Sequence, residues 1–180
     1  MAVKLYLYDW QDNMERRAGY AAEYCADYSI WASYCARTNP DTRSFAISAA
    51  SEVAGAIERT GRRDMSISHL IFLTHGAPGY VHFPGGGFTR TNINLIQTVC
   101  EEYLMYGAQV EFWGCNVGEG GAGAQFLQAV GASALRHGGG TIFCSDSVTF
   151  SVPYAGQRFP VWTTIVQASV LPGGATTVRQ

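Results

Sequence analysis

The 180-residue chain has few charged residues and no basic or acidic cluster of the kind that binds a charged polymer. It carries 12 Lys and Arg against 14 Asp and Glu, which gives a net charge of -2 at pH 7. Proteins that bind nucleic acid present a basic face to the phosphates, and no run of Lys or Arg supplies one. No apolar run approaches the roughly 18 residues that a membrane-spanning helix needs. We therefore expect no nucleic acid or membrane partner, and a protein or peptide as substrate.

The N-terminus MAVKLYLYDWQ lacks the charged segment, apolar segment and small-residue cleavage site of a secretory signal. This absence predicts a cytoplasmic protein, with a specialised export route as the alternative. The five cysteines are an odd number, show no CxxC spacing and have no histidine pair nearby. Such a pattern does not indicate a zinc site. We expect neither a metal nor a cofactor, and the oligomeric state stays open.

Two stretches stand out because an apolar run stops at a chemically reactive residue. HLIFLTHGAPG ends its apolar run at His75 and Gly76, and QVEFWGCNVG ends its run at Cys115. Both runs are short, rich in β-branched or aromatic residues and bounded by glycine, which is typical of buried parallel strands. Loops at the carboxyl ends of such strands share one crevice. The sequence therefore predicts that His75 and Cys115 meet at one edge of a sheet.

The remaining patterns predict one domain over residues 1–180, with a core over 1–170 and a loose tail over 171–180. Their alternation predicts a three-layer α/β/α sandwich around a mainly parallel six-stranded sheet whose last strand can run antiparallel. Strands are expected at 3–8, 45–47, 70–73, 110–113, 141–144 and 161–166, with an extended segment at 80–83. Helices are expected at 13–37, from Ser48 or Ser51 to a stop at Gly61, from a cap at Thr91 to a stop at Gly107, and around 126–134.

The motif pair TxHGxxG and GCxxG resembles the caspase-like cysteine peptidases of clan CD, which include legumains, metacaspases and gingipains. The likeness is to a bacterial branch with HGxxG and GCNxG motifs, and it covers about residues 44–147. The resemblance implies the caspase-like fold, the strand order 2-1-3-4-5-6 and hydrolysis of peptide bonds. Phe112, Trp113 and Gly114 match neither the caspase nor the metacaspase pattern, so substrate specificity does not transfer.

The candidate catalytic residues are Cys115 as nucleophile and His75 as acid/base. The backbone N–H groups of Gly76 and Cys115 can form an oxyanion hole, because a glycine lets the substrate carbonyl approach the main chain closely. The helix predicted after Gly118 points its N-terminus back toward Cys115, which favours a thiolate over a thiol. By the resemblance, His75 protonates the leaving amine.

Two acidic residues are candidates for binding the substrate. Asp9 ends the first predicted strand, and Asp146 follows the strand beyond Cys115, so the two carboxylates could flank a pocket. A carboxylate in a partly desolvated pocket favours a cationic side chain, and a bidentate fit favours Arg over Lys. Equally, Asp9 could serve a helix start, and Asp146 a turn through Ser145 and Ser147.

Two other functions compete with the peptidase. Gly118, Gly120 and Gly123 form GxGxxG between a strand and a helix, with Asp146 placed as a ribose-binding acid would be, which predicts a dinucleotide site. Two observations argue against a dinucleotide site. The glycines begin several residues past the strand end, and His75 and Gly76 would have no role in binding a dinucleotide. The second alternative is a caspase-like fold that has lost activity and serves as a binding module.

Other residues of the reactive types have plainer explanations. His82 competes with His75 as the catalytic histidine, but no glycine follows it. Cys100 shares a helix face with apolar residues, which predicts a core position. The basic residues 59–63 are expected in a solvated turn, with recognition of an acidic peptide side chain as the alternative.

Overall fold

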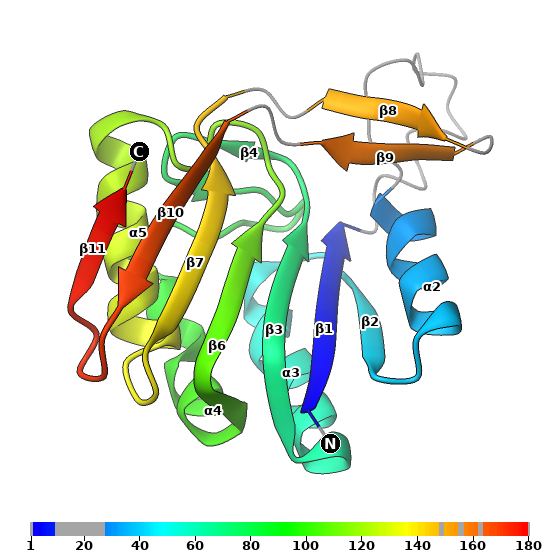
Figure 1. Cartoon of the computed structure of the whole chain (residues 1–180), viewed down its shortest axis with the longest axis horizontal. Helices are drawn as coiled ribbons and strands as arrows, with labels where there is room; N and C mark the ends of the chain where they lie inside the picture. The colour runs from blue at the N-terminus through cyan, green and yellow to red at the C-terminus, as the bar shows by residue number, and fades with distance from the viewer. Residues whose placement is uncertain (1, 10–27, 148–149, 155–156, 162–163, 180) are drawn as a thin grey trace.

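The computed structural model describes residues 2–9, 28–147, 150–154, 157–161 and 164–179. Its centre is a seven-stranded sheet in the order β11-β10-β7-β6-β3-β1-β2 (Figure 1). Strands β2, β1, β3, β6 and β7 run parallel, and β10 and β11 are antiparallel to their neighbours. The strands are β1 Ala2–Asp9, β2 Thr42–Ile47, β3 Ser66–Leu73, β6 Leu104–Phe112, β7 Gly140–Ser145, β10 Ile165–Val170 and β11 Thr176–Arg179.

Helices cover both faces of the sheet, which confirms the predicted α/β/α sandwich. Alternate residues of β3 show the two faces: Phe72 packs in the main core with α3, while Ile71 and Leu73 pack with Ala32 of α2. In Figure 1, α3 and α5 lie behind the sheet, and α4 lies at the lower end of β6. The helices are α2 Tyr28–Thr38, α3 Ala50–Asp64, the 3-10 turn η1 Ile93–Ile96, α4 Gln97–Tyr103 and α5 Gly120–Ala134.

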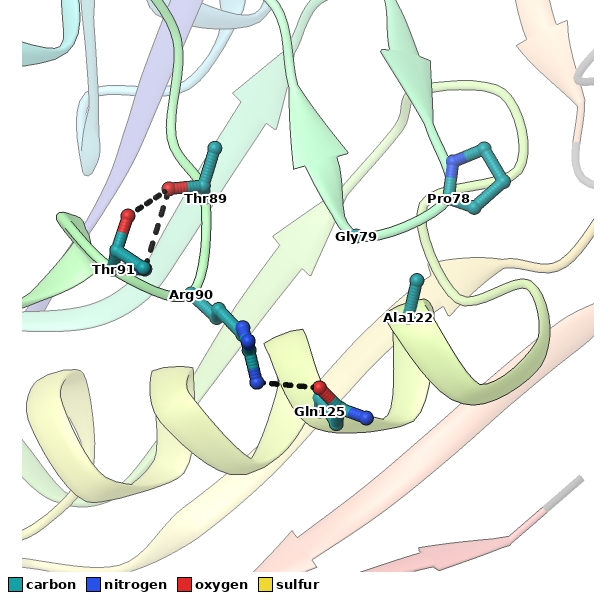
Figure 2. A pocket seen from close by; sticks show the side chains of 7 residues that line it. All are labelled: Pro78, Gly79, Thr89, Arg90, Thr91, Ala122 and Gln125. Carbon is teal, nitrogen blue, oxygen red and sulfur yellow. Dashed lines mark hydrogen bonds between the residues drawn. The ribbon is translucent and has the colours of Figure 1, made fainter.

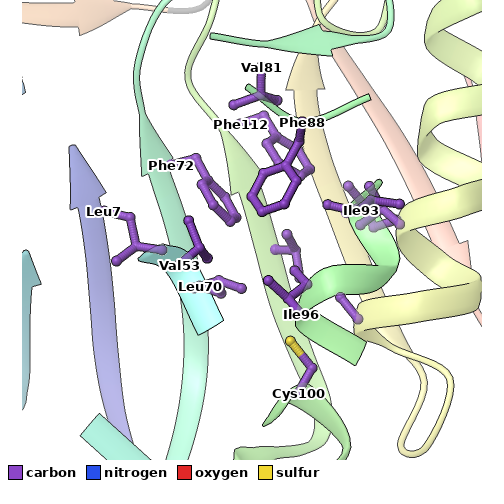
Figure 3. Close-up of a cluster of buried hydrophobic side chains, with 14 of the residues drawn as sticks. Leu7, Val53, Leu70, Phe72, Val81, Phe88, Ile93, Ile96, Cys100 and Phe112 are labelled. Atoms are coloured by element: carbon purple, nitrogen blue, oxygen red, sulfur yellow. The ribbon is translucent and has the colours of Figure 1, made fainter. Parts of the chain in front are cut away.

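Aromatic side chains fill the core behind the centre of the sheet (Figure 3). The rings of Phe72 on β3 and Phe112 on β6 stack with centroids 4.9 Å apart and planes 14° from parallel. Phe126 of α5 meets Phe112 edge-on at 5.3 Å, and Phe88 meets Phe72 edge-on at 6.0 Å. Such pairs contribute about 0.5–1.5 kcal/mol each beyond their buried area. The core therefore fixes how β3 and β6 are aligned.

Two small antiparallel hairpins lie outside the main sheet. The first joins β4 Gly76–Ala77 to β5 Tyr80–Val81 and directly follows His75. The second joins β8 Phe150–Tyr154 to β9 Gln157–Val161 and lies beyond the carboxyl ends of the parallel strands in Figure 1. The extended segment predicted at 80–83 is thus only two residues long as a strand. The second hairpin was not predicted.

The predicted strand order is correct for the six strands that were expected, and the last of them is antiparallel. Two details at the C-terminus differ. The last of the six lies at Ile165–Val170 rather than 161–166, and the tail predicted to be loose contributes a seventh strand, β11. Ala168 and Val170 of β10 alternate with more exposed residues, and β11 continues the antiparallel pairing after a turn at Gly173 and Gly174.

Helix α3 differs from its prediction at both ends. Neither Ser48 nor Ser51 caps it; the Ser48 N–H and hydroxyl instead donate to the Glu52 carboxylate at 2.8 and 2.6 Å. Gly61 lies inside the helix, where its missing side chain leaves room for the Tyr103 ring. The helix ends at Met65, whose φ of 69° is left-handed.

The crossover between β3 and β6 also differs in detail. Thr91 is not the cap, because the first helical turn is the 3-10 turn η1, with Asn92 before it. Helix α4 ends in the extended residue Leu104, so Gly107 lies in β6 rather than at a helix stop. Cys100 is buried in the core, as predicted. Most of the helix predicted at 13–37 lies outside the described residues.

Candidate active site

The alignment of β3 with β6 brings the two predicted catalytic residues to the same edge of the sheet. Phe72 pairs with Phe112, and the Trp113 N–H donates to the Phe72 carbonyl at 2.9 Å. His75 and Cys115 each lie three residues beyond this pair. Because the strands are parallel, equal offsets past a paired position place both residues at the carboxyl edge.

The loops that carry these residues touch through their main chains. A Cβ built on Gly114 would lie 3.0 Å from the Gly76 nitrogen and 3.1 Å from the His75 carbonyl carbon. A Cβ built on Gly76 would lie 2.9 Å from the Cys115 carbonyl oxygen and 2.5 Å from Val117 Cγ2. A side chain at Gly76 would force the loops apart, and one at Gly114 would require the facing main chain to shift by a few tenths of an ångström. The close approach of the two loops thus favours glycine in both motifs and requires it at Gly76.

The Gly76 N–H points away from its partner strand in the hairpin. Gly76 pairs with Val81 in the hairpin, but Val81 exchanges both of its main-chain hydrogen bonds with Phe88, at 3.0 and 2.9 Å. In a pair that does not exchange hydrogen bonds, the N–H points away from the partner strand. The peptide group between His75 and Gly76 packs beside Gly114, which lies directly before Cys115.

The turn that carries Cys115 is held by the end of β7. The Asn116 N–H donates to the Ser147 carbonyl at 3.0 Å, and the Gly118 N–H donates to the Ser145 carbonyl at 2.8 Å. Asn116 has a left-handed φ of 58°, a conformation that Asn tolerates better than most residues and that often marks a functional turn. These bonds fix the main chain on the C-terminal side of Cys115.

The loop of His75 is held by hydrogen bonds to the segment around His82. The His82 N–H donates to the His75 carbonyl at 2.9 Å, and the hydroxyl of buried Thr74 donates to the carbonyl of His82. The rings of His75 and His82 lie 6.5 Å apart. Both histidines line a pocket of about 320 Å³ with Gly76, Ala77 and Tyr80.

The cysteines differ in their surroundings. Cys115 is half-buried at this edge, whereas Cys100 and Cys144 are buried in the core. Burial raises the pKa of Cys144 to about 12 and raises that of Cys100 as well. Burial also raises the pKa of Cys35 on α2, although its contacts with Tyr6 and Lys4 act in the opposite direction. Cys25 lies outside the described residues.

The two candidate substrate-binding carboxylates, Asp9 and Asp146, lie at the ends of the expected strands. Neither is among the described residues that line the pocket of His75 and His82. Asp9 is only 2% exposed, at the end of β1. Asp146 is half-buried in a tight turn after β7, in which the Ser147 N–H donates to the Ser145 hydroxyl at 3.2 Å and that hydroxyl donates to the Ser147 carbonyl at 2.9 Å. The turn expected as the alternative for Asp146 is therefore present.

The three glycines of the GxGxxG pattern have packing and turn positions. A Cβ on Gly118 would lie 2.6 Å from the Cys144 sulfur, and one on Gly123 would overlap the Gly118 main chain. Gly120 begins α5 with a left-handed φ of 60°. The Gly118 and Gly123 N–H groups already donate to the carbonyls of Ser145 and Glu119, at 2.8 and 3.0 Å. The loop thus has a role in the fold that needs no bound phosphate.

The basic residues 59–63 lie on α3 and not in a turn. Arg62 pairs with Glu58 one helical turn away at 2.5 Å, and the Arg59 guanidinium lies over the Phe45 ring at 5.0 Å. A different arginine, Arg90, lines a pocket next to the hairpin of β4 and β5, with Pro78 and Gly79. Arg90 has little local signal of a functional role, because it stands alone between two threonines.

A parallel sheet with a histidine loop and a cysteine loop in contact at its carboxyl edge defines an α/β domain with a candidate cysteine–histidine site. Residues 27–149 match a family described as a domain of unknown function (DUF4347), and the chain belongs to that family. The matched region contains His75, Cys115 and Asp146 but not Asp9. No curated protein and no solved structure matches the chain.

Neither a membrane span nor a metal site is found in the described part of the chain. No helix there is both long enough and apolar enough to cross a bilayer. No three His, Cys, Asp or Glu residues of the described ranges gather closely enough to hold a metal ion.

Proposed function

We propose that the domain is a caspase-like cysteine endopeptidase that hydrolyses peptide bonds with Cys115 as nucleophile and His75 as acid/base. The observation that carries the proposal is the equal offset of both residues past the paired Phe72 and Phe112, with Gly76 and Gly114 in main-chain contact between them. A nucleophile and its base must come from adjacent loops held in a fixed relation. The half-buried position of Cys115 is compatible with access by a substrate.

The proposed reaction has two halves. The His75 imidazole takes the proton of the Cys115 thiol, and the thiolate attacks the carbonyl carbon of the scissile bond. The carbonyl oxygen becomes an oxyanion, to which the N–H groups of Gly76 and Cys115 donate. The C–N bond breaks as His75 returns the proton to the leaving amine. A water, deprotonated by the same imidazole, then hydrolyses the thioester and restores the thiol.

Gly76 has a specific part in this mechanism. Its N–H points away from its hairpin partner Val81, and the close packing of Gly76 against Val117 and the Cys115 carbonyl holds this donor beside the Cys115 turn. The pocket lined by His75, Tyr80 and His82 is the neighbouring space for a substrate residue. A donor placed where the oxyanion forms stabilises the transition state more than the substrate.

The test is turnover of quenched fluorescent peptide pools. The parent is expected to cleave them, and Cys115→Ala and His75→Ala are each expected to reduce kcat/KM by about 10³-fold or more. His82→Ala is the matched control, because His82 lines the same pocket, and it is expected to keep turnover within about tenfold. Near-full turnover by the His75 variant would remove the dyad. A parent that binds the pools without cleaving them would instead indicate a binding module.

For substrate specificity we propose a cationic residue on the amino side of the cleaved bond, held by Asp9 or Asp146. Asp9 ends β1 and Asp146 directly follows β7, and these two strands flank the pair that carries the dyad. Asp9→Asn and Asp146→Asn are to be assayed on substrates ending in Arg, Lys, Asp and Leu. Arg preference in the parent that one variant loses, with the Leu substrate unaffected, is expected. A parent that prefers Asp or Leu would contradict it.

A further inference from the structure

A second pocket, of about 480 Å³, lies beside the candidate active site. Three segments form its described wall: the turn of the hairpin at Pro78 and Gly79, the residues 89–91, and the first turns of α5 at Ala122 and Gln125 (Figure 2). Its volume falls within the range of about 300–1,000 Å³ that is usual for ligand sites. The family match covers all of these residues.

The electrostatic character of this pocket comes from one side chain. Among the described residues that line it, Arg90 alone carries a charge, and Thr89 and Thr91 add hydroxyl groups. Pro78 and Ala122 give the opposite wall an apolar surface. A pocket with one guanidinium, hydroxyl groups and an apolar wall suits a carboxylate at the end of a short methylene chain.

Arg90 is held in place before any ligand arrives. Its Nη1 donates to the Gln125 Oε1 of α5 at 2.6 Å, which Figure 2 shows across the floor of the pocket. A guanidinium has five N–H donors, so one bond to an amide leaves donors for a two-pronged contact with a carboxylate. The amide of Gln125 is neutral, so it leaves the positive charge of Arg90 in place, whereas a carboxylate partner would neutralise that charge.

The main chain around Arg90 is equally fixed. The Thr89 N–H donates to Asn92 Oδ1 at 2.7 Å, and Asn92 Nδ2 donates to the Gly87 carbonyl at 3.0 Å. The Thr91 N–H donates to the Thr89 hydroxyl at 3.2 Å. A short loop closed by its own side chains loses little conformational entropy on binding, so the pocket is preorganised.

The opposite wall is fixed to α5. The Gly79 N–H donates to the Val117 carbonyl at 3.0 Å, and a Cβ built on Gly79 would lie 2.7 Å from the Ala122 carbonyl oxygen. Gly79 also has a left-handed φ of 69°. The hairpin turn can therefore approach α5 only with glycine at this position, and this contact ties the pocket to the loop that follows Cys115.

The hairpin connects this pocket to the candidate active site. Its strands, through Gly76 and Tyr80, line the pocket of His75, while its turn lines the pocket of Arg90. An extended peptide advances about 3.3 Å per residue, so the two-residue strands correspond to about two or three substrate residues. We infer that the Arg90 pocket binds an acidic side chain, Asp or Glu, of the peptide substrate, a few residues from the cleaved bond.

This specificity rests on the proposed function, and it is compatible with a cationic residue at the cleaved bond because the two sites are separate. Binding can be measured without turnover on the full-length Cys115→Ala protein. The probes are fluorescein-labelled decapeptide pools, randomised except for one fixed Glu, Gln or phosphoserine that is moved through every position. We expect one position at which Glu binds about tenfold more tightly than Gln.

Three variants in the Cys115→Ala background assign the preference to the pocket. Arg90→Gln is expected to abolish the Glu preference, and Gln125→Glu to weaken it strongly, because a new carboxylate would neutralise Arg90. Arg63→Gln removes another exposed guanidinium, on α3, and is expected to leave the preference unchanged. Thermal unfolding of each variant shows whether it is folded. Because the Gln125→Glu variant keeps Arg90, a loss of the Glu preference in this variant cannot come from lost packing of the Arg90 side chain.

The outcomes separate the two proposals. Equal binding of the Glu and Gln pools at every position, or a Glu preference that survives Arg90→Gln, would overturn the acidic pocket. Tighter Arg90-dependent binding of phosphoserine than of Glu would reassign it to phosphopeptides and overturn it too. Failure of the parent to cleave any pool would overturn the peptidase, whereas the binding data on the Cys115→Ala protein would still decide the pocket.

Discussion

The space behind the sheet and the loops at its carboxyl edge hold cysteines in opposite surroundings. Behind the sheet, Cys100 is 1% exposed and Cys144 is 0% exposed. At the edge, Cys115 is half-buried in a turn next to the histidine loop. Because a thiol reacts as its thiolate, burial in apolar surroundings suppresses reactivity, while an accessible turn permits it. The same residue type is a packing group in one region and a candidate nucleophile in the other.

Glycine shows the same contrast. Gly61 in α3 leaves room for the Tyr103 ring, so its role lies in packing two helices. Gly76 leaves room for the Val117 side chain and the Cys115 carbonyl at the edge of the sheet. Both positions exclude a side chain for steric reasons, but only the second lies where the proposed chemistry occurs. A position that sterically or conformationally requires glycine can therefore serve either function or packing, and the requirement alone does not tell which.

Chemical labelling is the strongest test of the contrast between the cysteines. With iodoacetamide near pH 6, Cys115 is expected to react at least about 100-fold faster than Cys100 and Cys144, because the buried thiols react only when the structure opens. Mass spectrometry of tryptic peptides after timed quenching gives the rates. Cys35 is the stringent comparison, since it too is half-buried and burial raises its pKa. Labelling of Cys35 or Cys100 as fast as Cys115 would remove the nucleophile assignment.

Paired glycine substitutions are expected to have the next largest effect. Gly76→Ala and Gly61→Ala each introduce a methyl group where no space exists, so each is expected to lower the free energy of unfolding by about 1–3 kcal/mol. Only Gly76→Ala is expected to abolish peptide cleavage as well. Urea denaturation and turnover are measured on the same samples at a temperature where all variants are folded.

The control for the glycine pair is Gly121→Ala in the first turn of α5, where a Cβ meets no atom within 4 Å. This substitution is expected to leave cleavage unchanged and to stabilise the helix slightly, by up to about 1 kcal/mol. If Gly61→Ala lost activity to the same degree as Gly76→Ala, the effect would come from general destabilisation. The contrast between edge and interior would then not hold for glycine.

The central strands and their order could be predicted because their sequences carry strong local signals. The run before His75 is apolar at every residue from Leu70 to Leu73, and all four are buried, as a strand covered on both faces requires. The meeting of His75 and Cys115 at one edge followed from the parallel arrangement alone. Residue spacing could not predict the exact register, in which Phe72 pairs with Phe112 and their rings stack.

The features that could not be predicted depend on contacts between distant segments. Gly61 has the local signature of a helix stop, but tertiary packing against Tyr103 carries the helix past it to Met65. Strand β11 is a short run of Thr and Val whose identity as a strand comes from pairing with β10. The pocket of Arg90 joins three segments separated by many residues, so no window of sequence contains it.

The smallest expected effect is on the pH dependence of the free energy of unfolding, and it tests the buried cysteines of the core. Burial raises the pKa of Cys144 from 9.0 to about 12, so in the folded state the thiol keeps its proton at pH values where the unfolded chain releases it. Below about pH 8.5 both states are protonated and the group adds no pH dependence. Between there and about pH 12 the folded state binds more protons, so stability falls as the pH rises.

The slope that one such thiol contributes is about 1.4 kcal/mol per pH unit. Cys144→Ala should therefore show a flatter decline in stability than the parent above about pH 9, even though the lost sulfur lowers its stability at neutral pH. Urea denaturation at half-unit steps from pH 7.5 to about 10.5 measures the difference. A Cys144→Ala curve parallel to that of the parent would show that folding does not withhold the Cys144 thiol from titration.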